Sequence, residues 1–282
     1  MIAATALAAR EKGTGALSCS QFDMIGGTSV GFLIGSALAC GIPAEGVVNF
    51  FNTEAPKIFQ ASLWRNLTRL TAAAKYDPTA LKDALTRMLG TRTLADCKVP
   101  LMGTAVDMKS GRNTYFQSHT KSSEDDTEIV LGFDCGISLV DLALASSAAQ
   151  SYFPGHAVGP YLFWDGGTTG CNAPDMLLLT EALELGNAMA KISMLSLGAG
   201  TTDWKYTNEN LTNPSLPVVV EATIEAVYSC GETNAVWQAR SLLQGAGGQH
   251  RRISPYLFNY AIDDASEMTL TELAKAASID PI

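Results

Sequence analysis

Residues 22–35 read FDMIGGTSVGFLIG, and the rest of the chain is organised around this stretch. Met24 and Ile25 are typical of the end of a short buried strand, and the small and apolar residues from Val30 to Cys40 predict a helix. Between the two lies the pattern Gly27-x-Ser29-x-Gly31. A sharp strand-to-helix turn crowds the positions two before and two after its apex, where glycine removes the Cβ atoms that would clash. The pattern therefore predicts such a turn, with the Ser29 hydroxyl held out at the sheet edge.

The position of Ser29 makes its hydroxyl a candidate nucleophile. The helix that follows would direct its first N–H groups, beginning with that of Val30, and the positive end of its dipole toward the same point. A hydroxyl beside a group that stabilises an anion is what acyl transfer requires. Glycine-rich turns with an incidental serine share the pattern, so the stretch alone leaves both interpretations open.

The composition favours a large folded unit and argues against several classes of function. Of the 282 residues, 47% are hydrophobic and 17% are charged, which supports a sizeable core. The formal net charge of −9 argues against nucleic acid as the main partner. None of the six cysteines has CxxC spacing, and the acidic run at residues 124–126 is typical of a solvated loop. We therefore expect no metal and no organic cofactor.

The apolar runs bear on the relation of the chain to membranes. None reaches the roughly 18 residues that cross a bilayer, and residues 1–9 lack the basic region of a signal peptide. We therefore expect neither a membrane span nor a leader, and a cytoplasmic location by default. Peripheral binding to a lipid interface stays compatible with the composition.

Strand patterns alternate with helix patterns along the chain. This alternation predicts an α/β fold with a largely parallel central sheet covered on both faces. We expect helices over residues 44–70 and 218–243, the second interrupted near Gly231, and a flexible stretch at residues 245–249. Neither an internal repeat nor a clear linker is evident, so residues 1–282 are predicted to form a single domain.

Asp165 is the first candidate for a base that activates Ser29. Four apolar residues, 161–164, precede it in a predicted short strand, and Gly166 and Gly167 follow it. A carboxylate that such neighbours partly desolvate has a raised pKa and becomes a better base. An ordinary Asp-Gly turn would give the same local pattern.

Histidines offer a different base. The chain has three, His119, His156 and His250, and the order Ser29, Asp165, His250 is the chain order of an α/β-hydrolase triad. Those enzymes place several strands before the serine, whereas here about twenty-five residues precede it. The triad therefore stays as an alternative.

Several stretches together resemble the patatin-like phospholipase family. Residues 22–31 are similar to its nucleophile elbow, and residues 165–167 to its Asp-Gly-Gly motif. Residues 144–154 resemble the segment that precedes this motif, and residues 195–200 resemble a later strand and turn. The order and spacing agree from the N-terminus to about residue 200, so each match supports the others.

The resemblance implies a fold, an activity and a set of site residues. The fold would be a three-layer α/β/α sandwich, and a Ser–Asp dyad without histidine would hydrolyse acyl esters of lipids. Ser29 would be the nucleophile, Asp165 the base, and an acyl ester or a phospholipid the partner. The other motif residues belong to the elbow and to the turn: Gly27, Val30, Gly31, Gly166 and Gly167.

One departure from the family pattern concerns the oxyanion hole. The family carries a glycine-rich loop after its first strand, and no such run precedes the elbow here. We expect a sheet without that strand to have unpaired backbone groups, which favour pairing with another chain and so a homo-oligomer. We also expect slow turnover that is best on short, activated esters. Two alternatives stay open, namely a reading frame that begins further upstream and a lipid- or acyl-binding module without turnover.

Overall fold

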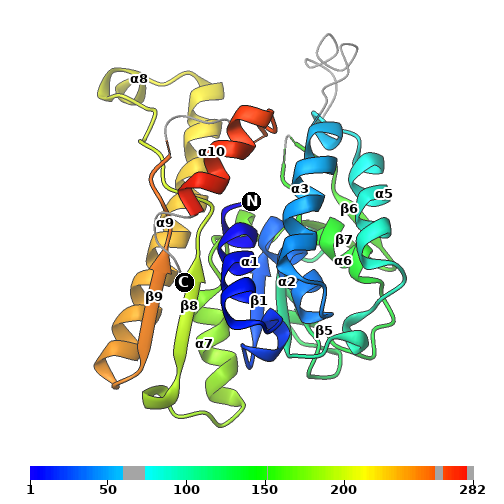
Figure 1. The fold of residues 1–282 in the computed structure, drawn as a ribbon. Coiled ribbons are helices and arrows are strands. Elements are labelled where there is room, and N and C mark those ends of the chain that lie inside the picture. Colours follow the sequence, from blue (N-terminus) through cyan, green and yellow to red (C-terminus); the bar gives the residue numbers. More distant parts are fainter. Residues whose placement is uncertain (60–73, 151, 258–262, 278–282) are drawn as a thin grey trace.

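The computed structural model describes residues 1–59, 74–150, 152–257 and 263–277 (Figure 1). Its helices are α1 (Ile2–Thr14), α2 (Val30–Ala39), α3 (Ala44–Ile58), α5 (Pro78–Leu89), α6 (Leu139–Ser146), α7 (Asp175–Glu184), α8 (Asn208–Thr212), α9 (Leu216–Gly245) and α10 (Glu267–Ala277). Its strands are β1 (Ile25–Thr28), β2 (Leu101–Asp107), β3 (Arg112–Gln117), β4 (Ser123–Glu124), β5 (Glu128–Leu131), β6 (His156–Val158), β7 (Tyr161–Asp165), β8 (Ser193–Leu197) and β9 (Gln249–Ile253).

The main sheet has seven strands in the order β4-β5-β3-β2-β7-β6, with β1 also paired to β2. The pairs β1–β2 and β3–β5 are parallel, whereas β2–β3, β2–β7, β4–β5 and β6–β7 are antiparallel. The predicted α/β class is confirmed, but the sheet is mostly antiparallel, where the alternation of patterns favoured parallel pairs. The physical reason is that short turns join β2 to β3 and β6 to β7, and a turn of this length can only connect antiparallel strands.

Helices cover both faces of the main sheet, which gives the predicted three layers. On one face α2 and α6 pack over a row of buried phenylalanine rings. The ring centroids of Phe32 and Phe116 are 5.4 Å apart, and those of Phe116 and Phe163 are 5.9 Å apart. On the other face α7 approaches β1 so closely that a Cβ at Gly26 would lie within 3.0 Å of Leu178. A smaller parallel sheet of β8 and β9 lies beside this body, with α9 packed along β9 (Figure 1).

The described strands β1 and β8 are among those with one edge that lacks a recorded partner strand. Within the described ranges, β1 pairs with β2 alone and β8 pairs with β9 alone. Backbone groups along such edges can pair with an added strand. The expected homo-oligomer stays a prediction.

The described helices follow the predicted pattern with two differences in extent. The helix expected over residues 44–70 begins at Ala44, and α3 ends at Ile58, while residues 60–70 lie outside the described part. The stretch expected to be flexible is a short connection, because α9 ends at Gly245 and β9 begins at Gln249. Among the described residues, no helix combines the length and the apolar character needed to cross a bilayer.

The interruption predicted near Gly231 is wrong, because α9 is continuous over 30 residues. The glycine serves close packing instead. A Cβ at Gly231 would lie within 3.0 Å of the backbone of Gly170, at the end of the turn η3 (Gly166–Thr169). Glycine in a helix interior costs stability relative to alanine, and here the close approach of two backbones requires it.

We predict that Gly231→Ala lowers the free energy of unfolding by about 1–3 kcal/mol, because the new methyl group forces α9 away from Gly170. Gly245→Ala in the same helix is the matched control, since nothing lies within 4 Å of a Cβ there. It should be neutral or stabilising by up to about 1 kcal/mol. Urea unfolding followed by circular dichroism measures both, and equal effects of the two substitutions would contradict the packing argument.

Candidate active site

The register of two strands on β2 brings Ser29 and Asp165 together. β1 pairs with the first half of β2 and β7 with the second half, on the same edge, because β3 occupies the other edge. β1 runs parallel to β2 and β7 antiparallel to it, so their carboxyl ends meet. Thr28 lies opposite Thr104, and Asp165 lies opposite the next residue, Ala105. Ser29 follows Thr28 directly, so the fold closes a separation of 136 positions.

Ser29 has a strained backbone. Its φ of 56° and ψ of −128° make it the one non-glycine residue with positive φ in the described part of the chain. Such a conformation costs about 1–3 kcal/mol and persists only where its surroundings hold it. The Ser29 N–H donates to Ser146 Oγ at 2.9 Å, and Ser146 Oγ donates to the Thr104 carbonyl at 2.7 Å. Ser146 therefore fixes the turn to β2.

The two elbow glycines differ in why they are needed. A Cβ at Gly27 would lie within 3.0 Å of the Gly31 backbone, which supports the predicted clash on the strand side of the turn. At Gly31 the steric reason fails, because outside its own helix no atom of the described residues lies within 4 Å of a Cβ built there. The space over the first turn of α2 is therefore open next to Ser29.

The first two backbone N–H groups of α2 lie next to Ser29 at the start of the helix. Neither Val30 N–H nor Gly31 N–H has an acceptor among the described residues, whereas Phe32 N–H and Leu33 N–H both donate to the Ser29 carbonyl. The Val30 side chain is 42% exposed. Two unsatisfied donors at a helix N-terminus are suited to stabilise negative charge on a bound oxygen.

Asp165 is buried, and its pKa is raised. Asp165 is 1% exposed, and its carboxylate accepts a hydrogen bond from Gly167 N–H at 2.8 Å. Burial raises the pKa of Asp165 to about 6, against the opposing effect of the hydrogen bonds from Ser29 and Gly167. A carboxylate with this pKa has the properties of a general base.

The turn that follows Asp165 is packed on both sides. A Cβ at Gly166 would lie within 3.0 Å of the Thr104 side chain, and one at Gly167 within 3.0 Å of the Tyr228 ring. Both glycines of the motif are therefore required by close contacts. The Tyr228 ring covers the turn from α9, and burial, then the charge of Asp165, raises the pKa of the Tyr228 hydroxyl to about 12.

Sequence reasoning missed Tyr228. The one signal that could have found it is its spacing from Gly231, because residues three apart lie on the same side of a helix. Tyr228 and Gly231 both face the turn of residues 166–170 from α9. An aromatic residue and a glycine at this spacing indicate a helix face that packs closely on backbone.

Each of the three histidines has a carboxylate partner other than Asp165. The Nε2 atoms contact carboxylates in each case: His119 with Glu181 at 2.6 Å, His156 with Asp141 at 3.2 Å, and His250 with Asp175 at 2.9 Å. His250 is in β9 rather than in a flexible stretch, and its side chain is fully enclosed. The arrangement therefore pairs His250 with a carboxylate other than Asp165.

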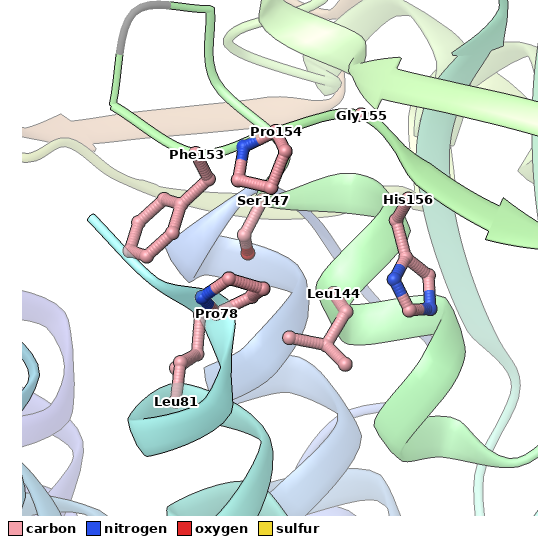
Figure 2. A pocket seen from close by; sticks show the side chains of 8 residues that line it. All are labelled: Pro78, Leu81, Leu144, Ser147, Phe153, Pro154, Gly155 and His156. Atoms are coloured by element: carbon pink, nitrogen blue, oxygen red, sulfur yellow. The ribbon is translucent and has the colours of Figure 1, made fainter. Parts of the chain in front are cut away.

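His156 lines a small pocket that Figure 2 shows, between α5, α6 and the start of β6. The Ser147 hydroxyl also faces this pocket and is buried without a hydrogen-bond partner in the described residues. The cavity of about 20 Å³ is sufficient for about one water molecule, which could satisfy that hydroxyl. An acyl chain would not fit in this volume. Among the described residues, no group of three or more His, Cys, Asp or Glu side chains could hold a metal ion.

Comparisons with known proteins point to one family. The family model described as patatin-like phospholipase matches residues 1–177. Over 180 residues the chain is 36% identical to a cGAMP-activated phospholipase of Pseudomonas aeruginosa. The matched region covers 63% of this chain and 51% of the relative. It is 32% identical over 165 residues to a cGAMP-activated phospholipase of Escherichia coli, covering 57% and 44% of the two chains. Identity to patatin-T5 of Solanum tuberosum is 25% over 231 residues, covering 71% and 56%. The chain thus spans about half the length of the curated relatives it matches.

We predict that Asp165→Asn raises the free energy of unfolding at pH 7. The raised pKa means that the ionised carboxylate destabilises the folded state above pH about 6, and a neutral amide removes this effect. The gain should be at most about 3 kcal/mol, because one pKa unit corresponds to about 1.4 kcal/mol. It should shrink as the pH falls from 7 to 4, where Asp165 is itself protonated in the folded state. Denaturant unfolding at pH 7 and pH 4 measures the difference, and a gain that does not depend on pH would contradict it.

Proposed function

The chain belongs to the patatin-like phospholipase family, and on that premise we propose that it hydrolyses acyl esters of lipids with Ser29 as nucleophile and Asp165 as base. The observation that carries the proposal is the strand register, which brings the strained Ser29 next to the buried Asp165 carboxylate at one point of β2. A hydroxyl beside a carboxylate whose pKa is raised to about 6 can lose its proton to that carboxylate as it attacks.

The proposed reaction passes through a covalent acyl-enzyme. Ser29 Oγ attacks the ester carbonyl while its proton moves to Asp165, and the N–H groups of Val30 and Gly31 stabilise the negative charge that forms on the carbonyl oxygen. The ester bond then breaks, and the leaving alcohol takes the proton from Asp165. In the second half Asp165 accepts a proton from water, the resulting hydroxide attacks the acyl group, and Ser29 leaves with that proton.

Two alternatives are less well supported. A triad through His250 is disfavoured because its Nε2 atom contacts Asp175 at 2.9 Å. A binding module without turnover would not need a strained serine beside a buried carboxylate, a combination that costs stability. Labelling by a fluorophosphonate separates the binding module from the hydrolase, because only a reactive serine forms the covalent adduct.

We predict that Ser29→Ala abolishes both fluorophosphonate labelling and hydrolysis of p-nitrophenyl esters, with the circular dichroism spectrum unchanged. A series of esters of increasing chain length measures the activity and the acyl preference together. Because the names of the bacterial relatives describe cGAMP activation, each assay is run with and without cGAMP. Full activity of the Ser29→Ala variant in both conditions would exclude the mechanism.

Asp165→Asn should lower kcat by about a hundredfold or more, since an amide cannot accept the serine proton. His250→Ala is the matched control for the triad, and kcat should stay within about threefold of the wild type if a dyad operates. Circular dichroism checks that both variants remain folded. A loss from the folded His250→Ala variant as large as that from Asp165→Asn would instead favour the triad.

The rate should depend on pH through Asp165. A base acts in its ionised form, so kcat/KM should fall as the pH decreases through about 6 and should be level above it. The Tyr228→Phe variant keeps the ring that covers the turn, and its acid limb should coincide with that of the wild type. Tyr228→Ala admits water to Asp165 and should move the acid limb to lower pH, toward the ordinary pKa of aspartate. Coincident acid limbs for the alanine and phenylalanine variants would contradict this role of the ring.

A further inference from the structure

Three residues of α9 contact the chain segment that follows the candidate base, residues 166–172. The second and third follow the first by three and four positions, so all three share one side of the helix. Their contacts advance along the segment: Tyr228 on Gly167, Gly231 on Gly170, and Glu232 on Asn172. The first two are packing contacts, and the third is a hydrogen bond from Asn172 Nδ2 to Glu232 Oε2 at 2.9 Å. Helix α9 therefore holds the segment from its beginning to its end.

The carboxylate of Glu232 is itself held from the smaller sheet. Arg252 of β9 donates from Nη2 to Glu232 Oε1 at 2.5 Å and from Nη1 to Ser196 Oγ of β8 at 2.7 Å. A Cβ at Gly198 would lie 2.7 Å from Arg252 Nη2, so this glycine leaves room for the guanidinium group. The side chains of Glu232 and Arg252 are 26% and 17% exposed. Glu232 thus offers one oxygen to each neighbour, and a partly buried ion pair fixes its orientation.

The end of the same segment also contacts the elbow. The Thr28 hydroxyl donates to the Cys171 carbonyl at 2.6 Å, and Thr28 directly precedes Ser29. Cys171 is in turn the residue before Asn172. A shift of Asn172 would therefore reach the elbow through a single peptide unit. Misplacement of reacting groups by about 1 Å is sufficient to lower a reaction rate by about a hundredfold.

We propose that Glu232 and Arg252 are positioning residues, which hold residues 166–172 in the geometry that proton transfer between the two members of the dyad requires. The proposal rests on the proposed function, because it concerns the reaction of that dyad. Both residues lie beyond residue 177, where the match to the family model ends, so membership of the family does not itself assign them a role. The smaller sheet thereby takes part in the active site, since its two strands carry the partners that orient Glu232.

The chemistry of the contact allows its direction to be reversed. A carboxylate offers an acceptor oxygen to each of two donors, whereas an amide offers one oxygen and one NH₂ group. Glu232→Gln can therefore satisfy Arg252, but its NH₂ group then faces the NH₂ group of Asn172. Asn172→Asp in the same chain restores an acceptor at that point. The double variant has both contacts and the wild-type net charge, with the hydrogen bond between positions 172 and 232 reversed.

The test follows the titration of Asp165 by the ¹³C chemical shift of its carboxyl carbon, which requires no turnover, and measures kcat and KM on p-nitrophenyl butyrate. Asn172→Ala removes the contact without changing a charge, and Glu232→Gln is the second single variant. Both should lower kcat about tenfold and leave KM within about twofold, because the geometry of the dyad changes and substrate binding does not. Both should also lower the pKa of Asp165, since a loosened turn admits water to a carboxylate whose pKa is raised by burial.

The double variant Asn172→Asp with Glu232→Gln should return kcat to within about threefold of the wild type and restore the titration of Asp165. The matched control is Glu225→Gln, which removes a carboxylate from the same side of α9 two turns earlier, where its partner is Lys205. It should behave as the wild type does. A wild-type kcat and titration in both single variants overturns the proposal, as does a double variant no better than Glu232→Gln.

Two further results keep the outcomes separate. Circular dichroism shows whether each variant folds, and if Glu232→Gln does not, Asn172→Ala decides alone, because it leaves the ion pair of Glu232 with Arg252 intact. If the wild type hydrolyses no ester, with or without cGAMP, the proposed function fails. The titration of Asp165 in the variants then still decides whether the ion pair positions the carboxylate.

Discussion

The structure depends on one edge of β2, which two strands share end to end. Because β1 stops opposite Thr104 and β7 stops opposite Ala105, the chain must turn away from the sheet twice at nearly one point. Alternation along β7 puts Asp165 on the same face as Phe163, which is the face that α2 covers. A slip of one residue in this register would send the carboxylate to the opposite face, away from Ser29. The register of three short strands therefore sets the geometry of the dyad.

The same region concentrates features that cost free energy. Ser29 is strained, Asp165 is a buried carboxylate, and the first two N–H groups of α2 lack acceptors in the described residues. Rigid surroundings offset these costs. The Phe32, Phe116 and Phe163 rings pack beneath the turn, and hydrogen bonds through Ser146 tie it to β2. Strain of this kind is stored where the packing around it is dense and specific.

The sequence was informative where a contact is local and weak where it joins distant segments. The elbow could be predicted because Gly27, Ser29 and the helix start fall within a few residues, and Asp165 because its glycines follow it directly. Tyr228 could not, because its role depends on a contact across 61 positions with Gly167. The direction of the strands was misjudged for a related reason. Alternating strand and helix patterns do not reveal that two strands such as β2 and β3 follow each other through a short turn. Family resemblance marked residues 144–154, but only the fold shows that Ser146 holds the elbow.

The backbone angle at Ser29 also restricts which nucleophiles evolution could place there. Serine and threonine carry the same hydroxyl, and chemistry alone would allow either. A residue branched at Cβ is a severe outlier at positive φ, so the turn excludes threonine while it tolerates serine or cysteine, which are unbranched. The turn can therefore accept a thiol in place of the hydroxyl, as in cysteine, but it cannot accept the additional methyl group of threonine.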